Sequence, residues 1–336
     1  MEEITVVIPN YNGEKYLEEC LEALEEQEVG SPKFKVLVVD NGSDDGSVSL
    51  LNAYMEKTAK MQEPHIFETE CIFLNENTGF CHAVNVGIQE ARSPYVILLN
   101  NDTKVKAGFI KSLYKAINSD EKIFSVSSKM LMWDKPELID DAGDRYCVLG
   151  WAYSRGKGKK ATVFDKPADV FAACGGASIY RRSVFDEIGL FDELHFAYLE
   201  DIDIGYRAKI HGYRNRYEPS AEVLHYGSAS TGSRYNERKT QLASANSVYI
   251  IGKNMPFLQC LINLPFLVTG FFLKFLFFCR KGMGMLYLKG LGAGVKRSFS
   301  KQGRMNKESF ALRHLGNYIR IQLQLYVNTL RIIMKS

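Results

Sequence analysis

The chain has 336 residues, which is enough for one large domain or two ordinary ones. Its composition, with 46% hydrophobic and 24% charged residues, excludes the disordered and collagen-like classes. The net charge of +3 is too small to indicate a nucleic-acid partner, and none is expected. The charge is unevenly distributed, because residues 251–336 hold fourteen Lys and Arg residues against the single acid Glu308. An acidic body is therefore followed by a basic C-terminal region.

Cysteine usage and the N-terminus favour a protein of the reducing cytosol. The seven cysteines are scattered and odd in number, and no two are spaced as C-x-x-C, so neither a disulfide framework nor a zinc site is expected. The first residues, MEEITVVIPN, begin with acids, and their apolar run is too short for a secretory signal. This segment instead predicts a first β-strand.

Short β-branched runs alternate with helical patterns over the first 130 residues. Strands are expected at 5–8, 35–40, 71–74, 95–99 and 124–128. Apolar residues recur at helical spacing between the first two strands, and further helices are expected from Ser47, Phe80 and Gly108. This alternation predicts a parallel sheet with helices on both faces and ligands at the carboxyl ends of its strands.

The pattern becomes less regular after residue 130. Residues 132–168 are rich in Gly, Lys, Asp and Pro and predict a long surface excursion. Regular structure is expected again at 170–180, followed by a helix that begins near Glu200 and a strand around 223–225.

The C-terminal region predicts association with a membrane. Residues 254–273 carry no charge and are numerous enough to cross a bilayer, but Pro256, Pro265 and Gly270 interrupt them. An interfacial or re-entrant helix on an anionic membrane surface is therefore preferred over a crossing. An amphipathic stripe follows over 312–333, flanked by arginines. The alternative is that these helices pack on the rest of the chain or on a second copy in a homo-oligomer. The expected domains are 1–250 and 251–336.

Each predicted strand ends in polar residues suited to binding. The clusters are Pro9–Gly13, Asp40–Ser43, Asn75–Asn77 and Asn100–Asp102. No G-x-G-x-x-G motif follows a strand, and the glycine-rich pieces lack the Walker spacing, so dinucleotide and P-loop sites are not favoured.

Five motifs in order resemble the inverting family 2 glycosyltransferases of the GT-A fold, particularly their bacterial rhamnosyltransferase-like branch. They are VVIPNYNG, VVDNGSDDGS, NENTGFCHAVNVGI, LLNND and FDELHFAYLEDIDIGYR, and they extend over about two thirds of the chain. The resemblance implies an α/β nucleotide-diphospho-sugar transferase fold with a Rossmann-like mixed sheet. It also implies a metal-dependent enzyme that moves a sugar from a UDP- or dTDP-sugar to a hydroxyl of a growing, lipid-linked glycan in cell-surface polysaccharide biosynthesis.

The resemblance implies a nucleotide site built from the first three motifs, namely Pro9, Asn10, Tyr11, Asp40, Asn77, Gly79 and Asn85. Within it, Asp40 would accept a hydrogen bond from N3 of uracil or thymine. Turn, capping and packing roles are the alternatives for these residues.

A divalent metal site is implied by the fourth motif. Families of this fold use D-x-D there, whereas this chain has Asn100-Asn101-Asp102, which retains one carboxylate. Asp102, Asn100 and the downstream His225 would hold Mn²⁺ or Mg²⁺ against the donor diphosphate. A satisfied structural histidine is the alternative for His225.

The fifth motif supplies the base that a single displacement requires. The resemblance implies that Asp201 takes the acceptor proton and that Glu200 grips the acceptor, with Gly175 and Gly176 close to donor sugar and acceptor. Capping of the helix N-terminus is the alternative for both acids. Arg207 is assigned equally to a phosphate contact or to an ion pair.

The resulting hypothesis is a cytoplasmic glycosyltransferase, peripheral on the inner face of the cell membrane. Two other functions remain open at this point. One is a nucleotidyltransferase that makes sugar nucleotides, and the other is a non-catalytic, membrane-bound subunit that binds glycans.

Overall fold

The structure, a computed structural model, describes residues 3–27, 31–59, 68–227 and 236–334. Its main sheet contains β1 (Ile4–Asn10), β2 (Phe34–Asp40), β3 (Thr69–Phe73), β4 (Tyr95–Leu99), β5 (Thr103–Val105), β6 (Ile123–Met132), β7 (Lys135–Asp141), β10 (Ala168–Val170), β11 (Ala177–Arg181) and β12 (Arg214–His225). A separate hairpin is formed by β8 (Asp144–Tyr146) and β9 (Ala152–Ser154).

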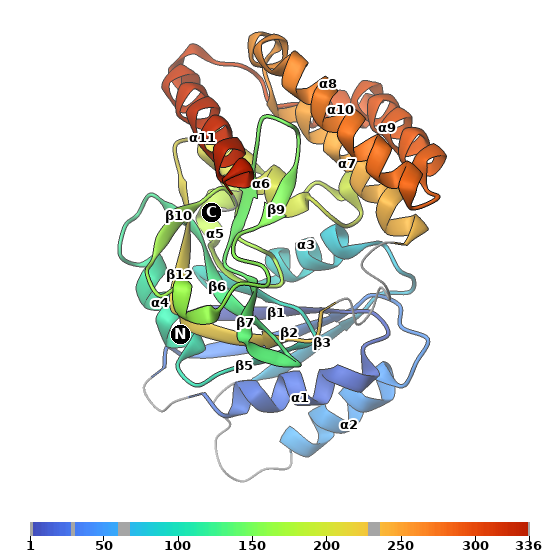
Figure 1. The fold of residues 1–336 in the computed structure, drawn as a ribbon. Helices are drawn as coiled ribbons and strands as arrows, with labels where there is room; N and C mark the ends of the chain where they lie inside the picture. Colours follow the sequence, from blue (N-terminus) through green and yellow to red (C-terminus); the bar gives the residue numbers. More distant parts are fainter. Residues whose placement is uncertain (1–2, 28–30, 60–67, 228–235, 335–336) are drawn as a thin grey trace.

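The helices of the first 210 residues cover the sheet, and those after residue 236 form a group of their own (Figure 1). The first group is α1 (Glu14–Glu25), α2 (Ser47–Ala59), α3 (Phe80–Glu90), α4 (Phe109–Ile117), α5 (Arg182–Ile188) and α6 (Glu200–Ile210). The second group is α7 (Glu237–Asn254), α8 (Phe257–Arg280), α9 (Gly284–Phe299), α10 (Lys301–Met305) and α11 (Leu315–Ile333).

The sheet is mixed rather than parallel throughout. Strand β1 lies parallel between β2 and β4, and this register places Asn10 opposite Asp40. Strand β11 runs antiparallel between β4 and β6, and β12 is parallel to β6. The parallel sheet expected from the alternation is therefore wrong beyond β4, because the chain from β6 to β11 contains no crossover helix and returns in the opposite direction. The mixed sheet that the resemblance implies is confirmed.

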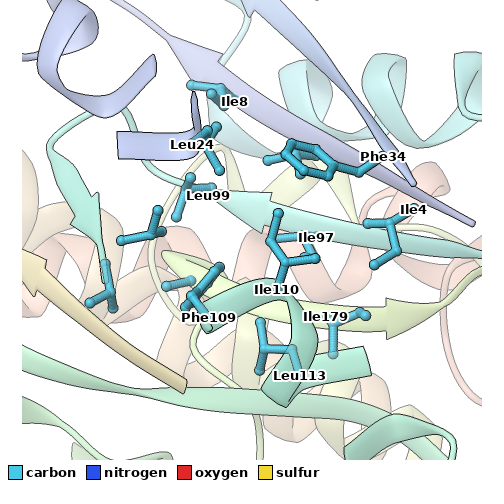
Figure 2. Packing of buried hydrophobic residues seen from close by; sticks show 14 of the residues in the cluster. Ile4, Ile8, Leu24, Phe34, Ile97, Leu99, Phe109, Ile110, Leu113 and Ile179 are labelled. Carbon is cyan, nitrogen blue, oxygen red and sulfur yellow. The ribbon is translucent and has the colours of Figure 1, made fainter. Parts of the chain in front are cut away.

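The core consists of two apolar layers on either side of the sheet. One layer packs β1, β2 and β4 against α1, α2 and α4, and Figure 2 shows Ile8, Leu24, Phe34 and Ile97 within it. The other layer packs the opposite faces of these strands against α3, α5 and α6. The five predicted strands and the predicted helix starts at or beside Ser47, Phe80 and Gly108 are all present.

The predicted surface excursion over 132–168 is only partly correct. It contains β7 and the β8–β9 hairpin. Tyr146 of β8 and Val148 of the turn that follows are fully buried with Phe171 and residues of α11. The segment needs few apolar residues of its own, because side chains of the C-terminal helices pack over it. Its local composition, rich in Gly and Lys, gives no sign of this packing.

The C-terminal helices pack on the sheet-containing body and leave apolar faces outward. Tyr318, Ile321 and Leu325 of α11 are buried in one cluster with residues of α6, and α7 packs along α9. Helix α8 continues through Pro265 without a break. Helix α7 extends through residue 250, so the two predicted domains share this helix, and the boundary itself stays a prediction.

A buried ionic cluster joins α7 to the start of α6. The ammonium Nζ of Lys253 lies 2.8 Å from Asp192 Oδ2 and 2.9 Å from Asp203 Oδ2, and all three side chains are almost fully buried. Arg207 and Asn254 also donate to Asp203. Despite burial, the neighbouring Lys253 and Arg207 hold the pKa of Asp203 far below its ordinary value.

Replacing Lys253 with Met is expected to lower the free energy of unfolding by about 3–5 kcal/mol, because two buried carboxylates lose their shared cation. Urea-induced unfolding would measure the change. Lys289→Met on the exposed side of α9 is the matched control and should stay within about 0.5 kcal/mol. Equal losses in the two variants would contradict the structural role of the cluster.

Candidate active site

The carboxyl ends of β1, β2 and β4 are tied together by side-chain hydrogen bonds. Asn10 Nδ2 donates to Asp40 Oδ2 at 2.7 Å, and Asn101 Nδ2 donates to Asn10 Oδ1 at 2.6 Å. Asp40 also accepts from the backbone and hydroxyl of Ser43. Asp40 is 1% exposed and orders the loop; its Oδ2 accepts two of these hydrogen bonds, and its Oδ1 accepts one and has capacity for a second.

The loop before α3 is held by a similar amide network. Asn41 Nδ2 donates to Asn77 Oδ1 and to the carbonyl of Gly79, both at 3.2 Å. Gly79 has φ +92°, and a Cβ there would lie 2.7 Å from the ring of Phe196. Only glycine combines this backbone conformation with such a close approach.

A cavity of about 410 Å³, here called the strand-end cavity, opens where these loops meet. Six of the predicted site residues line it: Pro9, Asn10, Tyr11, Asn77, Asn100 and Asp102. The other lining residues are Asn41, Phe80, Asn101, Phe196, Ala197, Tyr198, Asn236, Arg238, Lys239 and Leu242. The motifs of four strand ends therefore share one cavity, as the parallel register of β1 requires.

Asp102 faces His225 at the margin of this cavity. His225 Nε2 lies 3.5 Å from Asp102 Oδ1, and its Nδ1 lies 2.7 Å from Asp140 Oδ2. Burial alone would lower the pKa of His225, but the hydrogen bonds to Asp102 and Asp140 raise it to about 9. Asp140 fixes the orientation of the ring, an arrangement that is typical of metal-binding histidines. Asp140 lies in the predicted surface excursion, where no local pattern indicates a site residue.

Asp201 and Asn100 contact two adjacent glycines, Gly175 and Gly176. Asp201 Oδ1 accepts a hydrogen bond of 3.0 Å from the backbone of Gly175, and a Cβ on Gly175 would lie 2.7 Å from that oxygen. A Cβ on Gly176 would lie 3.2 Å from Asn100 Nδ2. The absence of side chains on the two glycines therefore lets Asp201 and Asn100 approach the same short piece of backbone.

Asp201 lines a second cavity, of about 390 Å³, here called the Asp201 cavity. Its other lining residues are Asp144, Ala152, Tyr153, Ser154, Lys157, Leu199 and Ile202. One carboxylate oxygen each of Asp201 and Asp144 and the sulfur of Cys174 all lie within 4.8 Å of one another. Burial raises the pKa of Asp201 well above its ordinary value, and the charges of Glu200 and Asp144 raise it further. The environment of Asp201 thus favours a carboxylate that accepts a proton.

The structure places Glu200 beside this region, but it places Arg207 and Asn85 elsewhere. Glu200 is 8% exposed, its Oε2 has no hydrogen-bond partner among the described residues, and burial raises its pKa to about 7. Arg207 is buried, and besides Asp203 it binds the carbonyls of residues 188–190, which supports the ion-pair alternative. Asn85 exchanges hydrogen bonds with the backbone of Phe191 and does not line the strand-end cavity.

The loop 196–199 borders both cavities and is held in an unusual conformation. Phe196, Tyr198 and Leu199 have φ values of 61°, 71° and 66°, which are rare for residues with side chains. Asn246 Nδ2 of α7 donates to the carbonyls of residues 195, 197 and 198, and Arg297 of α9 donates to Asn246 Oδ1. The C-terminal helices thus position a wall of the site, which local sequence patterns could not indicate.

Comparisons with known proteins fit this geometry. The model of glycosyl transferase family 2 matches residues 5–189, more than half of the chain. The chain belongs to this family. It is 28% identical over 228 residues to the N-acetylglucosaminyl-diphospho-decaprenol L-rhamnosyltransferase of Mycobacterium tuberculosis, a match that covers 59% of this chain and 68% of that relative. The predicted family is therefore confirmed.

Two solved structures show that this family 2 glycosyltransferase has the GT-A fold. S. aureus TarS 1–349 in complex with UDP-GlcNAc aligns with a TM-score of 0.58 at 16% identity, covering 100% of this chain and 93% of that chain. GalNAc-T7 with UDP, GalNAc and Mn²⁺ aligns with a TM-score of 0.60 at 17% identity, covering 75% of this chain and 48% of that chain. At these identities the likeness establishes the fold alone.

Proposed function

We propose that this glycosyltransferase moves a sugar from a UDP- or dTDP-sugar to a hydroxyl of a lipid-linked glycan in cell-surface polysaccharide synthesis, with inversion in one displacement. The observation that supports this most is that two cavities lie next to each other: the loop 196–199 borders both, and the adjacent Gly175 and Gly176 contact Asp201 of one and Asn100 of the other. A donor in the strand-end cavity and an acceptor in the Asp201 cavity would meet near this glycine pair. The names of the mycobacterial relative and of the UDP-GlcNAc complex support a nucleotide-sugar donor and a lipid-linked acceptor.

The strand-end cavity suits a nucleoside diphosphate. Its polar floor offers amides and the backbone of the β1 loop to a pyrimidine, and Tyr11 offers an aromatic ring. Arg238 and Lys239 in the first turn of α7 line the same cavity and supply positive charge for a diphosphate. A contact between Asp40 and the base remains part of the proposal.

The residues present fit a divalent metal. Asp102 and His225 combine a carboxylate with an imidazole whose orientation Asp140 fixes, and this donor set suits Mn²⁺. Mn²⁺ is also the ion named in the GalNAc-T7 complex. Asn100 offers a further oxygen at the same cavity. When bound there, the ion would neutralise charge on the leaving diphosphate.

Asp201 would act as the general base. As the acceptor oxygen bonds to the anomeric carbon, the bond from that carbon to the diphosphate breaks, the acceptor proton passes to Asp201, and the nucleoside diphosphate leaves. Attack from the side opposite the leaving group inverts the anomeric carbon. Glu200 would hold the acceptor, since its buried carboxyl oxygen has no other partner among the described residues.

Replacing Asp144 with Asn is expected to shift the acidic limb of the pH profile of kcat/KM to lower pH by about one unit. Asp201 accepts a proton only when ionised, and loss of the Asp144 charge lowers the pKa of Asp201. Initial rates between pH 5 and 9 would measure the shift. Asp165→Asn at an exposed site is the matched control. A limb that stays in place or moves to higher pH would contradict the assignment.

The C-terminal helices would hold the enzyme on the inner face of the cell membrane. Among the described residues, α8 is long and apolar enough to cross a membrane. However, Gln259 and Asn263 of α8 bind Gln322 of α11, so α8 is docked on the protein along its polar side. Its other face and that of α11 expose large side chains by more than half: Phe257, Leu258, Leu261, Leu264, Val268, Phe272, Ile319, Leu323, Leu330 and Ile333. Nearby Lys and Arg residues would add about 1 kcal/mol each on anionic lipid.

A donor panel tests the proposed activity. The purified full-length protein would be incubated with Mn²⁺ and a series of UDP- and dTDP-sugars, and release of UDP or dTDP would be measured with and without a lipid-linked acceptor. Release that depends on a particular donor and increases with acceptor is the expected result. No release with any donor would favour a binding subunit, and formation of a sugar nucleotide from a nucleoside triphosphate would favour a nucleotidyltransferase.

A further inference from the structure

A third cavity, also of about 410 Å³ and here called the basic cavity, lies between the β8–β9 hairpin and the C-terminal helices. Its lining residues are Arg145, Trp151, Ala152, Tyr153, Ser154, Arg155, Gly156, Lys157, Lys159, Lys274, Arg331 and Ile332. Figure 1 shows β9 beneath a loop that rises between α11 and α8. Trp151 Nε1 donates to the carbonyl of Gly270 in α8, and Tyr153 donates its hydroxyl to the carbonyl of Asn328 in α11. The cavity is therefore built jointly by the catalytic body and the C-terminal helices.

The charge of the basic cavity is strongly positive. Six of its lining residues are Lys or Arg, and no Asp or Glu is among the described residues that line it. Lys157 forms an ion pair with Asp140, which is not one of the lining residues. The guanidinium of Arg155 lies 4.6 Å from the ring centre of Phe164. Burial lowers the pKa of both Arg145 and Arg155, and the charge of Arg331 lowers both further. Cations that lower one another's pKa in one cavity are suited to a ligand that carries more than one negative charge.

The surroundings of the basic cavity suit the hydrocarbon part of a lipid. Arg331 and Ile332 belong to the last turns of α11, where Leu330 and Ile333 are 57% and 71% exposed. Lys274 comes directly after Leu273 of α8, which is 46% exposed. An anion bound here would thus have large apolar side chains beside it, which is the environment of a lipid headgroup rather than of a soluble anion.

The basic cavity also lies next to the Asp201 cavity. Ala152, Tyr153, Ser154 and Lys157 line both the basic cavity and the Asp201 cavity. A molecule with its phosphates in the basic cavity can therefore extend its sugar past β9 toward Asp201. One ligand with a lipid tail, phosphate groups and a terminal sugar, in that order, matches the apolar helices, the basic cavity and the Asp201 cavity.

We propose that the basic cavity binds the diphosphate of a polyprenyl-diphosphate-linked acceptor. The inference rests on the proposed function for the identity of the acceptor, and it adds the residues that recognise the phosphates. The headgroups of ordinary anionic phospholipids share the same phosphate chemistry. A headgroup without a sugar would leave the connection to the Asp201 cavity unused, and for this reason we assign the cavity to the acceptor.

The test measures binding of farnesyl diphosphate to the full-length protein by calorimetry, in detergent and with EDTA so that a metal at Asp102 does not contribute. The test variant is Lys159→Gln/Arg331→Gln, which removes two exposed cations of the cavity. The control is Lys160→Gln/Arg320→Gln, which makes the same charge change on neighbouring exposed residues outside it. The expected result is a Kd that is about tenfold or more higher in the test variant only. Farnesol should bind all three proteins equally and more weakly.

Three results would overturn the proposal. These are an unchanged Kd in the test variant, farnesol binding as tightly as farnesyl diphosphate, and complete displacement of farnesyl diphosphate by phosphatidylglycerol vesicles. In this third arm the phosphatidylglycerol vesicles are first dissolved in the same detergent, and complete displacement would assign the cavity to bulk lipid headgroups. The measurement needs no sugar donor and no turnover. It therefore tests the diphosphate site separately from the proposed transferase function. Retained binding in a protein that transfers no sugar would contradict the proposed function and leave the diphosphate site standing.

Discussion

Replacing Asp201 with Asn is expected to lower kcat for sugar transfer by about 100- to 10,000-fold and to leave the Kd for UDP unchanged. The amide retains an oxygen for the hydrogen bond from Gly175, so the loop keeps its shape, but it cannot take the acceptor proton. Transfer would be followed by acceptor labelling and UDP binding by calorimetry in the presence of Mn²⁺. The nucleotide is bound in the strand-end cavity under our proposal, and Asp201 does not line it.

The matched control for this prediction is Asp186→Asn on α5, because Asp186 is exposed and lines none of the three cavities. Its kcat should remain within about twofold of the unmodified enzyme. A parallel loss of transfer and of UDP binding in the Asp201 variant would mean that Asp201 supports the nucleotide site rather than acting as the base.

Replacing Asp102 with Asn is expected to lower transfer by about 100-fold and to raise the Mn²⁺ concentration needed for half-maximal rate. Asp102 supplies the one carboxylate of the Asn100-Asn101-Asp102 cluster, and His225 faces it at 3.5 Å. Titration of the rate with Mn²⁺ would show the change. Because Asp102 is also paired with His225, thermal unfolding of the variant would establish that the fold is retained.

Asp134→Asn is the matched control. Asp134 is an exposed acid in the turn between β6 and β7, and it lines none of the three cavities. The control substitution should leave both the rate and the Mn²⁺ dependence unchanged. If the Asp102 variant kept its rate at low Mn²⁺, the metal site would have to be placed elsewhere.

The parts of the site that the sequence predicted are those governed by local rules. Asn10, Asp40 and Asp102 follow apolar runs that form strands, and a parallel register brings the ends of neighbouring strands to one edge of the sheet. The helix starts at Ser47 and Phe80 follow in the same way from local spacing. Local patterns and the family motifs are therefore sufficient to predict the fold class and six of the residues that line the strand-end cavity.

The parts that the sequence did not predict depend on contacts between distant residues. Asp140 orients His225 across 85 positions of the chain, and Asn246 holds the carbonyl of His195 from 51 positions away. Asp144 lies beside Asp201 because its backbone pairs with that of Ala172, 28 positions further along the chain. No local composition or spacing encodes these pairings. The sequence predicts a surface excursion over 132–168 for the same reason. Buried residues of this segment, such as Tyr146 and Val148, pack on residues that are distant in the sequence.

A crystal structure of the enzyme with an intact UDP- or dTDP-sugar and Mn²⁺ tests the account most directly. We predict that the pyrimidine will lie beside Asn10 and Asp40, that the ion will contact Asp102 and His225, and that the anomeric carbon will face Gly175 with Asp201 on the side opposite the diphosphate. A sugar nucleotide bound with its anomeric carbon turned away from the glycine pair, or with Asp201 on the same side as the diphosphate, would contradict the proposed displacement.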